Sequence, residues 1–215
     1  MHVAEIWRYP VKSLGGERLE EAELRMDGIA GDRVVSVVYG GRVVTSRIRP
    51  ALLGLRGSTA EDGTPLVDGV PWRDPRALEA VRAATGGDVD LVADESLERF
   101  DVLPLSVASD GALARIGLDG RRFRPNLVIG GVDGLAERQW PGRMLKIGGG
   151  AAHVAVARLR PRCVMTTFDP DTQEQDRTVL RRLVDEYEGR FALDCSVVVA
   201  GTIRVGDTVE LRPAT

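Results

Sequence analysis

The sequence predicts a mostly β fold with a few short helices. Short apolar runs rich in Val, Ile and Leu are bounded by Gly, Pro, Asp and Asn, a pattern typical of short β-strands. These runs are Val34–Tyr39, Leu52–Leu55, Leu127–Ile129, Val154–Leu159, Ser196–Val199 and Thr208–Leu211. Turn residues at Tyr39–Arg42 and Val205–Thr208 predict β-hairpins between neighbouring strand-like segments.

Helical patterns are confined to three segments. Pro75–Ala84 begins with proline, has apolar residues at helical spacing and ends before Gly86. Ser109–Ile116 is a second, shorter candidate. Asp176–Tyr187 has the strongest pattern, because an aspartate can cap its first turn and apolar residues, Val184 among them, recur on one face. The sequence therefore predicts three helices.

The chain of 215 residues is long enough to build a hydrophobic core without a disulfide or a structural metal. The segment Ser58–Trp72 is rich in Gly, Pro, Asp and Thr and predicts a loop or hairpin. We place a boundary near residues 93–97. It separates an N-terminal β-barrel-like region, residues 1–95, from a second domain, residues 96–215.

The charges of the chain nearly balance. Lys and Arg total 29 against 32 Asp and Glu, which gives a formal net charge of -3. With this balance the protein has no overall positive potential that would attract nucleic acid or an anionic membrane, so we expect neither as a partner. Residues 1–10 contain no apolar run of signal-peptide length, and no later segment approaches a transmembrane span. We therefore expect a cytoplasmic protein in which a local cluster of charge binds any anion.

Three arginines, Arg158, Arg160 and Arg162, directly precede Cys163. Nearby cations stabilise a thiolate, which is the form of cysteine that binds a metal. Because a residue before proline is kept out of the helical conformation, we expect a strand to end at Pro161 and the thiol to face a pocket. The alternative is a buried cysteine with the arginines on a solvated strand face.

The other cysteine, Cys195, lies ahead of an apolar run, with one carboxylate and no cation beside it, which predicts a core position. In a reducing compartment the two cysteines of the chain are expected as free thiols. Two cysteines are too few for an iron–sulfur cluster of the usual four-cysteine kind. His2 and His153 are far apart in the sequence, so we do not expect a histidine metal site.

Side chains suited to a phosphate recur in loop positions. A guanidinium grips a phosphate through paired hydrogen bonds, lysine adds a point charge, and a hydroxyl completes the cradle. The candidates are Lys12, Ser13, Arg33, Arg47 and Arg124, with Asn126 as an amide that could bind the edge of a heterocycle. Taken singly, each of these cations could also be ordinary surface charge.

Asp101 stands between apolar residues just before a strand-like segment. Such a carboxyl group could donate a proton beside a metal, or it could be a turn or capping aspartate. The residues alone leave both roles open.

Five segments carry motifs in a fixed order along nearly the whole chain: Tyr9–Ser13, Gly31–Arg33, Phe123–Ile129, Arg162–Thr172 and Gly201–Asp207. Together they resemble the MOSC family with its N-terminal β-barrel region. Within that family the pattern is most similar to the mitochondrial amidoxime-reducing component and its bacterial counterparts. The Arg-Cys segment that ends in Asp-Pro-Asp-Thr is the most specific of the five.

The resemblance implies a MOSC β-barrel fold and a pyranopterin molybdenum cofactor, with Cys163 as the protein's sulfur ligand to the metal. A soft thiolate suits a metal already bound by sulfur, and the cofactor phosphate would match the scattered cations. The resemblance places Asp101 near the metal. The cofactor-binding residues it implies are Lys12, Ser13, Arg33, Arg124, Asn126 and Arg162, with Arg47 as a further candidate.

The same resemblance implies a molybdenum-dependent reductase of small N-hydroxylated or N-oxidised substrates. Electrons would come from a separate ferredoxin- or cytochrome-like protein, because the sequence has no Gly-x-Gly-x-x-Gly turn for a dinucleotide and too few cysteines for a cluster. Two alternatives stay open. One is a carrier that delivers the cofactor or a persulfide sulfur on Cys163, and the other is a barrel that has lost its cofactor and serves only in interaction.

Overall fold

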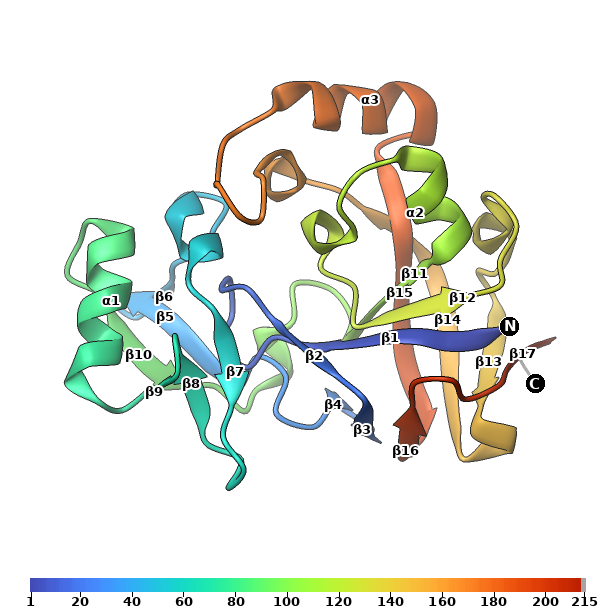
Figure 1. Cartoon of the computed structure of the whole chain (residues 1–215), viewed down its shortest axis with the longest axis horizontal. Coiled ribbons are helices and arrows are strands. Elements are labelled where there is room, and N and C mark those ends of the chain that lie inside the picture. The colour runs from blue at the N-terminus through green and yellow to red at the C-terminus, as the bar shows by residue number, and fades with distance from the viewer. Residues whose placement is uncertain (214–215) are drawn as a thin grey trace.

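A sheet of eight strands forms the larger part of the computed structural model, which describes residues 1–213 (Figure 1). Its strands are β1 (His2–Arg8), β2 (Glu17–Leu19), β11 (Leu105–Ser109), β12 (Leu127–Gly130), β13 (Arg143–Ile147), β14 (Ala152–Pro161), β15 (Arg190–Val199) and β17 (Val209–Pro213). Their order is β17-β13-β14-β15-β11-β12-β1-β2. All neighbours are antiparallel except β11 and β12.

Three smaller antiparallel sheets complete the β structure, and each has three strands. The first contains β16 (Gly201–Arg204), β3 (Glu21–Arg25) and β4 (Gly28–Ile29). The second contains β10 (Asp90–Ala93), β5 (Val35–Tyr39) and β6 (Arg42–Val43), and the third contains β7 (Gly57–Thr59), β8 (Pro65–Val67) and β9 (Val70–Pro71). The prediction of a mostly β fold is confirmed.

The three predicted helices are present as α1 (Pro75–Thr85), α2 (Asp110–Ile116) and α3 (Arg177–Tyr187). Each begins after a capping side chain that accepts a hydrogen bond from the first turn, as expected for aspartate and serine at this position. The capping residues are Asp74, Ser109 and Asp176. Short 3-10 helices are η1 (Pro50–Gly54), η2 (Leu97–Arg99), η3 (Gly120–Phe123), η4 (Ala136–Gln139), η5 (Gly148–Gly150) and η6 (Val164–Thr167).

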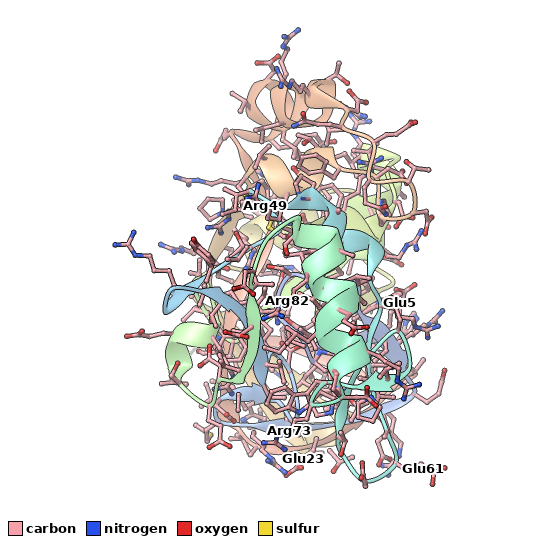
Figure 2. All side chains as sticks on the ribbon, turned by 90° about the vertical axis from the view of Figure 1, so that its left-hand side faces the viewer. Glu5, Glu23, Arg49, Glu61, Arg73 and Arg82 are labelled. Carbon is pink, nitrogen blue, oxygen red and sulfur yellow. The ribbon has the colours of Figure 1, made fainter. Side chains whose placement is uncertain are left out.

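Three separate apolar clusters stabilise different parts of the molecule. One cluster consists mainly of buried side chains of the large sheet. Another packs α2 and α3 against this sheet and includes Phe123, Tyr187 and Phe191. A third joins α1 to β5 and η1 at the opposite end (Figure 1). Figure 2 faces α1, where Arg82 ties the helix to the start of the next strand by donating to the Val89 carbonyl at 2.9 Å.

Three local predictions were wrong. Leu52–Leu55 falls mainly in the 3-10 helix η1 rather than in a strand, since Pro50 starts a helical turn that buries Leu52. The turn at Val205–Thr208 does not make a hairpin, because β16 and β17 belong to different sheets. Val184 is 57% exposed, because it lies one residue beyond the buried Leu183 and so points about 100° away around the helix.

The segment Ser58–Trp72, predicted as a loop or hairpin, forms the hairpins of β7, β8 and β9. The turn after Tyr39 is the predicted hairpin, with Tyr39 paired to Arg42. The chain leaves the small sheet after β10, which pairs with β5, and enters the large sheet at β11. The domain boundary near residues 93–97 stays a prediction. Within residues 1–213, no helix has the length and apolarity that a membrane crossing requires.

Candidate functional site

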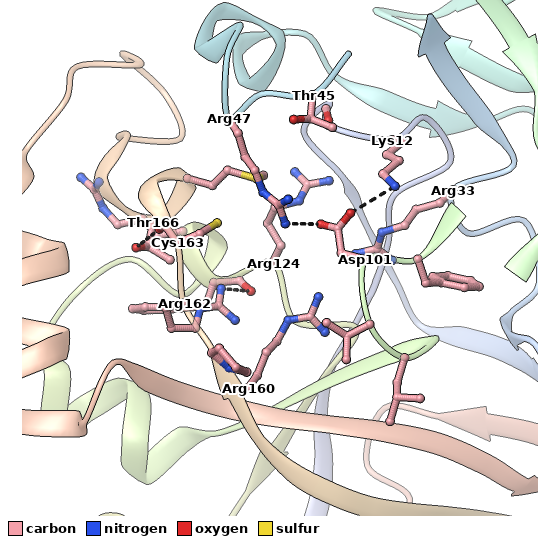
Figure 3. A pocket seen from close by; sticks show the side chains of 18 of the residues that line it. Lys12, Arg33, Thr45, Arg47, Asp101, Arg124, Arg160, Arg162, Cys163 and Thr166 are labelled. Atoms are coloured by element: carbon pink, nitrogen blue, oxygen red, sulfur yellow. Dashed lines mark hydrogen bonds and ion pairs between the residues drawn. The ribbon is translucent and has the colours of Figure 1, made fainter. Parts of the chain in front are cut away.

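A cleft of about 840 Å³, including the open solvent at its mouth, lies where loops of the N-terminal half meet the end of β14 (Figure 3). It brings together all of the candidate residues predicted from the sequence. Its lining includes Lys12, Ser13, Arg33, Arg47, Asp101, Arg124, Asn126, Arg162 and Cys163. Arg122, Arg160, Thr45, Met165 and Thr166 also line it.

Three of the lining residues adopt the left-handed backbone conformation that non-glycine residues rarely take. They are Ser13 with φ 76°, Arg33 with φ 55° and Arg124 with φ 49°. Such conformations cost about 1 kcal/mol or more each and persist only where the surrounding structure holds them, often at functional sites. They direct three short loops toward one space.

The loop that carries Arg33 is anchored by the fully buried Asp32. Asp32 Oδ1 accepts the Tyr9 N–H at 2.7 Å, and Oδ2 pairs with the Arg33 guanidinium. The Lys12 N–H donates to the Val35 carbonyl at 2.8 Å, which fixes the neighbouring loop to the start of β5. Arg33 and Lys12 are therefore held on one wall of the cleft by backbone contacts within the N-terminal half.

Arg124 is buried between this wall and the C-terminal half. Its Nη1 donates to the Leu14 carbonyl at 2.6 Å, and its guanidinium lies 4.1 Å from the centre of the Tyr9 ring. Burial lowers the pKa of Arg124 to about 10 and raises the pKa of Tyr9 to about 12. No carboxylate among the described residues hydrogen-bonds to this guanidinium, although the charges of Asp32 and Asp101 act on it from a distance.

Arg162 is a second buried guanidinium. Its Nη2 donates to the Phe123 carbonyl at 2.8 Å, and its charge lies 5.3 Å from the centre of the Phe123 ring. Burial lowers its pKa to about 9, with a further contribution from the positive charge of Arg160. A bound anion would oppose this shift by stabilising the charged form.

Buried donors without partners provide the test of whether this cleft fits an anionic cofactor. Among residues 1–213, Arg122 Nη1, Arg124 Nη2 and Arg162 Nε are buried and have no hydrogen-bond partner. Leaving such a donor unsatisfied costs about 1–3 kcal/mol, and more for a charged group. A phosphate or another oxygen-rich anion in the cleft would satisfy them, so the residues present fit the cofactor.

A second hollow of about 1030 Å³ adjoins the first, and Arg122, Arg124 and Met165 line both. Its other walls include the aromatic side chains of Trp7 and Phe168. Arg124 thus stands between two hollows.

Cys163 lies just beyond the end of β14, where the strand was expected to stop, and directly precedes η6. It is partly exposed, and Figure 3 shows its sulfur directed to the space between the arginines. The Thr166 hydroxyl donates to the Cys163 carbonyl at 2.9 Å and fixes this turn. Cys195, by contrast, is fully buried in the large sheet, and burial raises its thiol pKa, which confirms its predicted core position.

Asp101 closes one side of the cleft by binding two cations. Its Oδ1 lies 3.2 Å from Lys12 Nζ, and its Oδ2 accepts from Arg47 Nη2 at 2.8 Å (Figure 3). Burial acts to raise the pKa of Asp101, but Lys12, Arg47 and Arg33 outweigh it, so the pKa is lowered. The carboxylate is the favoured form at neutral pH, which supports a hydrogen-bond acceptor rather than the proton donor considered from the sequence.

Asn126 lines the cleft, but its amide is already engaged by the protein. Its Oδ1 accepts the Ser106 N–H at 3.1 Å, and its Nδ2 donates to the Asp32 carboxylate at 3.1 Å and to the Trp7 carbonyl at 3.3 Å. This structural role was not expected from the sequence, and the role as a cofactor ligand stays a prediction.

Arg160 and Arg122 are lining residues that the sequence-based selection omitted. The signal for Arg160 was present, because alternation along a strand places it on the same side as Arg162. Arg158 follows the same alternation, yet its side chain is 59% exposed and it is not among the lining residues. Arg122 pairs with Asp169 at 2.8 Å, a contact 47 residues apart that no local pattern predicts.

Comparison with known proteins agrees with this architecture. The MOSC domain model matches residues 93–210, and the MOSC N-terminal beta barrel domain model matches residues 1–86. The chain is 26% identical to mitochondrial amidoxime reducing component 2 of Macaca fascicularis, over 96% of this chain and 82% of that protein. It is 25% identical to mitochondrial amidoxime-reducing component 1 of Homo sapiens, over 97% of this chain and 82% of that protein.

Among solved structures, the YUAD protein from Bacillus subtilis aligns with 100% of this chain and 96% of its own, at 14% identity and a TM-score of 0.55. That likeness supports the fold alone. Because the MOSC domain model covers more than half of the chain and the barrel model covers most of the remainder, the chain belongs to the MOSC family.

Proposed function

We propose that this protein is a molybdenum-cofactor reductase of small N-hydroxylated or N-oxidised substrates. The observation that supports it most is the cluster of buried, unpaired guanidinium donors beside the partly exposed Cys163. A protein that keeps unsatisfied charged donors in a cleft is suited to an anionic ligand. The MOSC family suggests a molybdenum cofactor as this ligand, and the relatives named as amidoxime-reducing components suggest N-hydroxylated amidines as substrates.

Each residue has a distinct part in this proposal. The Cys163 thiolate would bind the metal, and Arg124 and Arg162 would bind the anionic part of the cofactor. Lys12 and Ser13 provide an ammonium and a hydroxyl from the facing loop. When bound, the cofactor would supply the two-electron redox chemistry that removal of the substrate oxygen requires.

Asp101 orients the substrate in this proposal. As a carboxylate it accepts a hydrogen bond from an N–H or O–H group, and an N-hydroxylated amidine offers both kinds of donor. Its contacts to Lys12 and Arg47 hold it at one side of the cleft without a substrate.

Electrons in this proposal come from a separate protein. The two cysteines of the chain are Cys163 in the cleft and Cys195 in the core, which leaves none for a cluster-bound relay. The electron donor would have to approach the open mouth of the cleft.

The test is turnover by protein produced in a host that makes the cofactor. With reduced methyl viologen as electron source, the molybdenum-loaded protein should convert benzamidoxime to benzamidine. A protein that contains molybdenum and pterin but gives no product with benzamidoxime or with an aliphatic hydroxylamine would contradict the reductase proposal. That result would favour a carrier that delivers the cofactor.

A further inference from the structure

Arg160 occupies a special position in the cleft. It extends from the end of β14, its side chain is only 16% exposed, and it lines the cleft together with Arg162 and Asp101 (Figure 3). Burial lowers its pKa, and the charges of Asp194, Arg33 and Asp101 also act on it. Arg160 is therefore a guanidinium inside the cleft rather than a surface cation.

Asp194 fixes this guanidinium from behind. The carboxylate of Asp194 is fully buried on β15, and its Oδ1 accepts from Arg160 Nη1 at 2.7 Å. Its Oδ2 accepts from Arg158 Nε at 3.2 Å. Among the residues that the structure describes, only Nη1 of Arg160 has a hydrogen-bond partner, so the other nitrogens of the guanidinium remain available to the cleft.

The charges leave Arg160 only partly compensated. One carboxylate, Asp194, is shared by two guanidiniums, so the group of three carries a net positive charge. The anionic part of a cofactor would be matched by Arg124 and Arg162, whose hydrogen bonds within residues 1–213 go to carbonyl groups and not to carboxylates. A positive charge beyond those two favours a second anion in the cleft.

We propose that Arg160, positioned by Asp194, binds an anionic group of the substrate, so that the protein prefers N-hydroxylated substrates that carry a carboxylate. A carboxylate matches the guanidinium through paired hydrogen bonds. This inference rests on the proposed function for the reacting group, but the anion site itself does not depend on turnover.

The first test measures binding of benzoate to the molybdenum-loaded protein by calorimetry. Arg160→Gln should weaken benzoate binding about tenfold or more, as expected for the loss of a charge-assisted contact. Asp194→Asn keeps the shape of the side chain and should weaken it by a smaller factor. Arg25→Gln is the matched control, because Arg25 is an exposed arginine on β3 that does not line the cleft, and it should leave benzoate binding unchanged.

Two outcomes of this test would overturn the proposal. One is equal benzoate binding in Arg160→Gln and the unaltered protein. The other is a loss of pterin from Arg160→Gln, which would assign Arg160 to the cofactor. Pterin content and melting temperature, measured on each variant, separate these outcomes from a failure to fold.

The second test compares 4-carboxybenzamidoxime with benzamidoxime. Arg160→Gln should raise KM for the acid about tenfold and leave KM for the neutral compound unchanged. An equal change for both compounds would contradict the proposal. If neither compound is reduced but benzoate binding still depends on Arg160, the reductase proposal fails while the anion site stands.

Discussion

The Asn126 side-chain amide donates a hydrogen bond to the buried Asp32 carboxylate at 3.1 Å, across 94 residues of sequence. The same carboxylate receives the Tyr9 N–H and pairs with Arg33, while the amide oxygen of Asn126 binds the Ser106 N–H. One buried polar network thus joins the N-terminal loops to the start of β11 and β12, directly behind the cleft. The positions of the cleft residues depend on this network as well as on the sheets.

Replacing Asn126 should therefore destabilise the whole protein. Asn126→Ala leaves buried partners at Ser106 and Asp32 unsatisfied, which should lower the free energy of unfolding by about 2–3 kcal/mol. For a chain of this length the melting temperature should fall by roughly 4–12 °C. Asp88→Ala, at an exposed residue, is the control and should change stability by less than about 0.5 kcal/mol. Equal melting curves for the two variants would show that the network is not needed for the fold.

Charge-removing changes at Lys12, Arg33 and Arg124 should lower cofactor occupancy. Each loses a charge-assisted contact worth roughly 1.5–3 kcal/mol, about tenfold or more in affinity. Extraction and quantification of the pterin from the three single alanine variants measures this directly. Arg25→Ala, at an exposed residue on β3, is the control and should retain full occupancy. Full occupancy in all three variants would rule out this placement of the cofactor.

The contribution of Asp101 to stability should depend on pH. Because its pKa is lowered in the folded protein relative to an ordinary value of about 3.9, folding gains stability from the carboxylate above that value. The gain is lost as the pH falls through the lowered pKa. Asp101→Asn should thus cost about 1 kcal/mol at pH 7, where two cations lose their partner, and the difference should shrink below about pH 3.9. Melting curves of Asp101→Asn and of the unaltered protein at several pH values test this prediction. A stability difference that grows in acid would contradict the lowered pKa of Asp101.

NADH alone should not support turnover by the purified protein. The sequence offers no Gly-x-Gly-x-x-Gly turn between a strand and a helix for a dinucleotide. Reduced methyl viologen, or a separate electron-transfer protein, should restore reduction of the same substrate. Oxidation of NADH at the rate of product formation, without any added protein, would contradict the proposed electron path.

The sequence predicted the strands and helices well where a single local rule decides the structure. Capping aspartate and serine side chains set the helix starts, and Pro161 ends β14 just before Cys163. It failed at Leu52, where proline starts a 3-10 turn in an apolar run, and at Val205–Thr208, where the partner strands lie in different sheets.

The site was predictable in its residue types but not in its contacts. Basic loop residues and Arg162-Cys163 could be selected from the sequence, because their chemistry is local. The shared use of Asp194 by Arg158 and Arg160, and the binding of Asn126 to Asp32, join segments far apart in the chain. Such long-range pairs, and the left-handed backbone at Ser13, are consequences of the tertiary fold that no local pattern encodes.

The role of Cys163 as the protein's ligand to molybdenum can be observed by X-ray absorption at the molybdenum edge. The loaded protein should show one more sulfur ligand than the Cys163→Ala variant, whose fold should be unchanged. Cys195→Ala is the matched control: it should keep the metal environment of the unaltered protein and lose about 1–2 kcal/mol of stability, because Cys195 is fully buried in the large sheet. Identical sulfur coordination in the loaded protein and in Cys163→Ala would contradict the account.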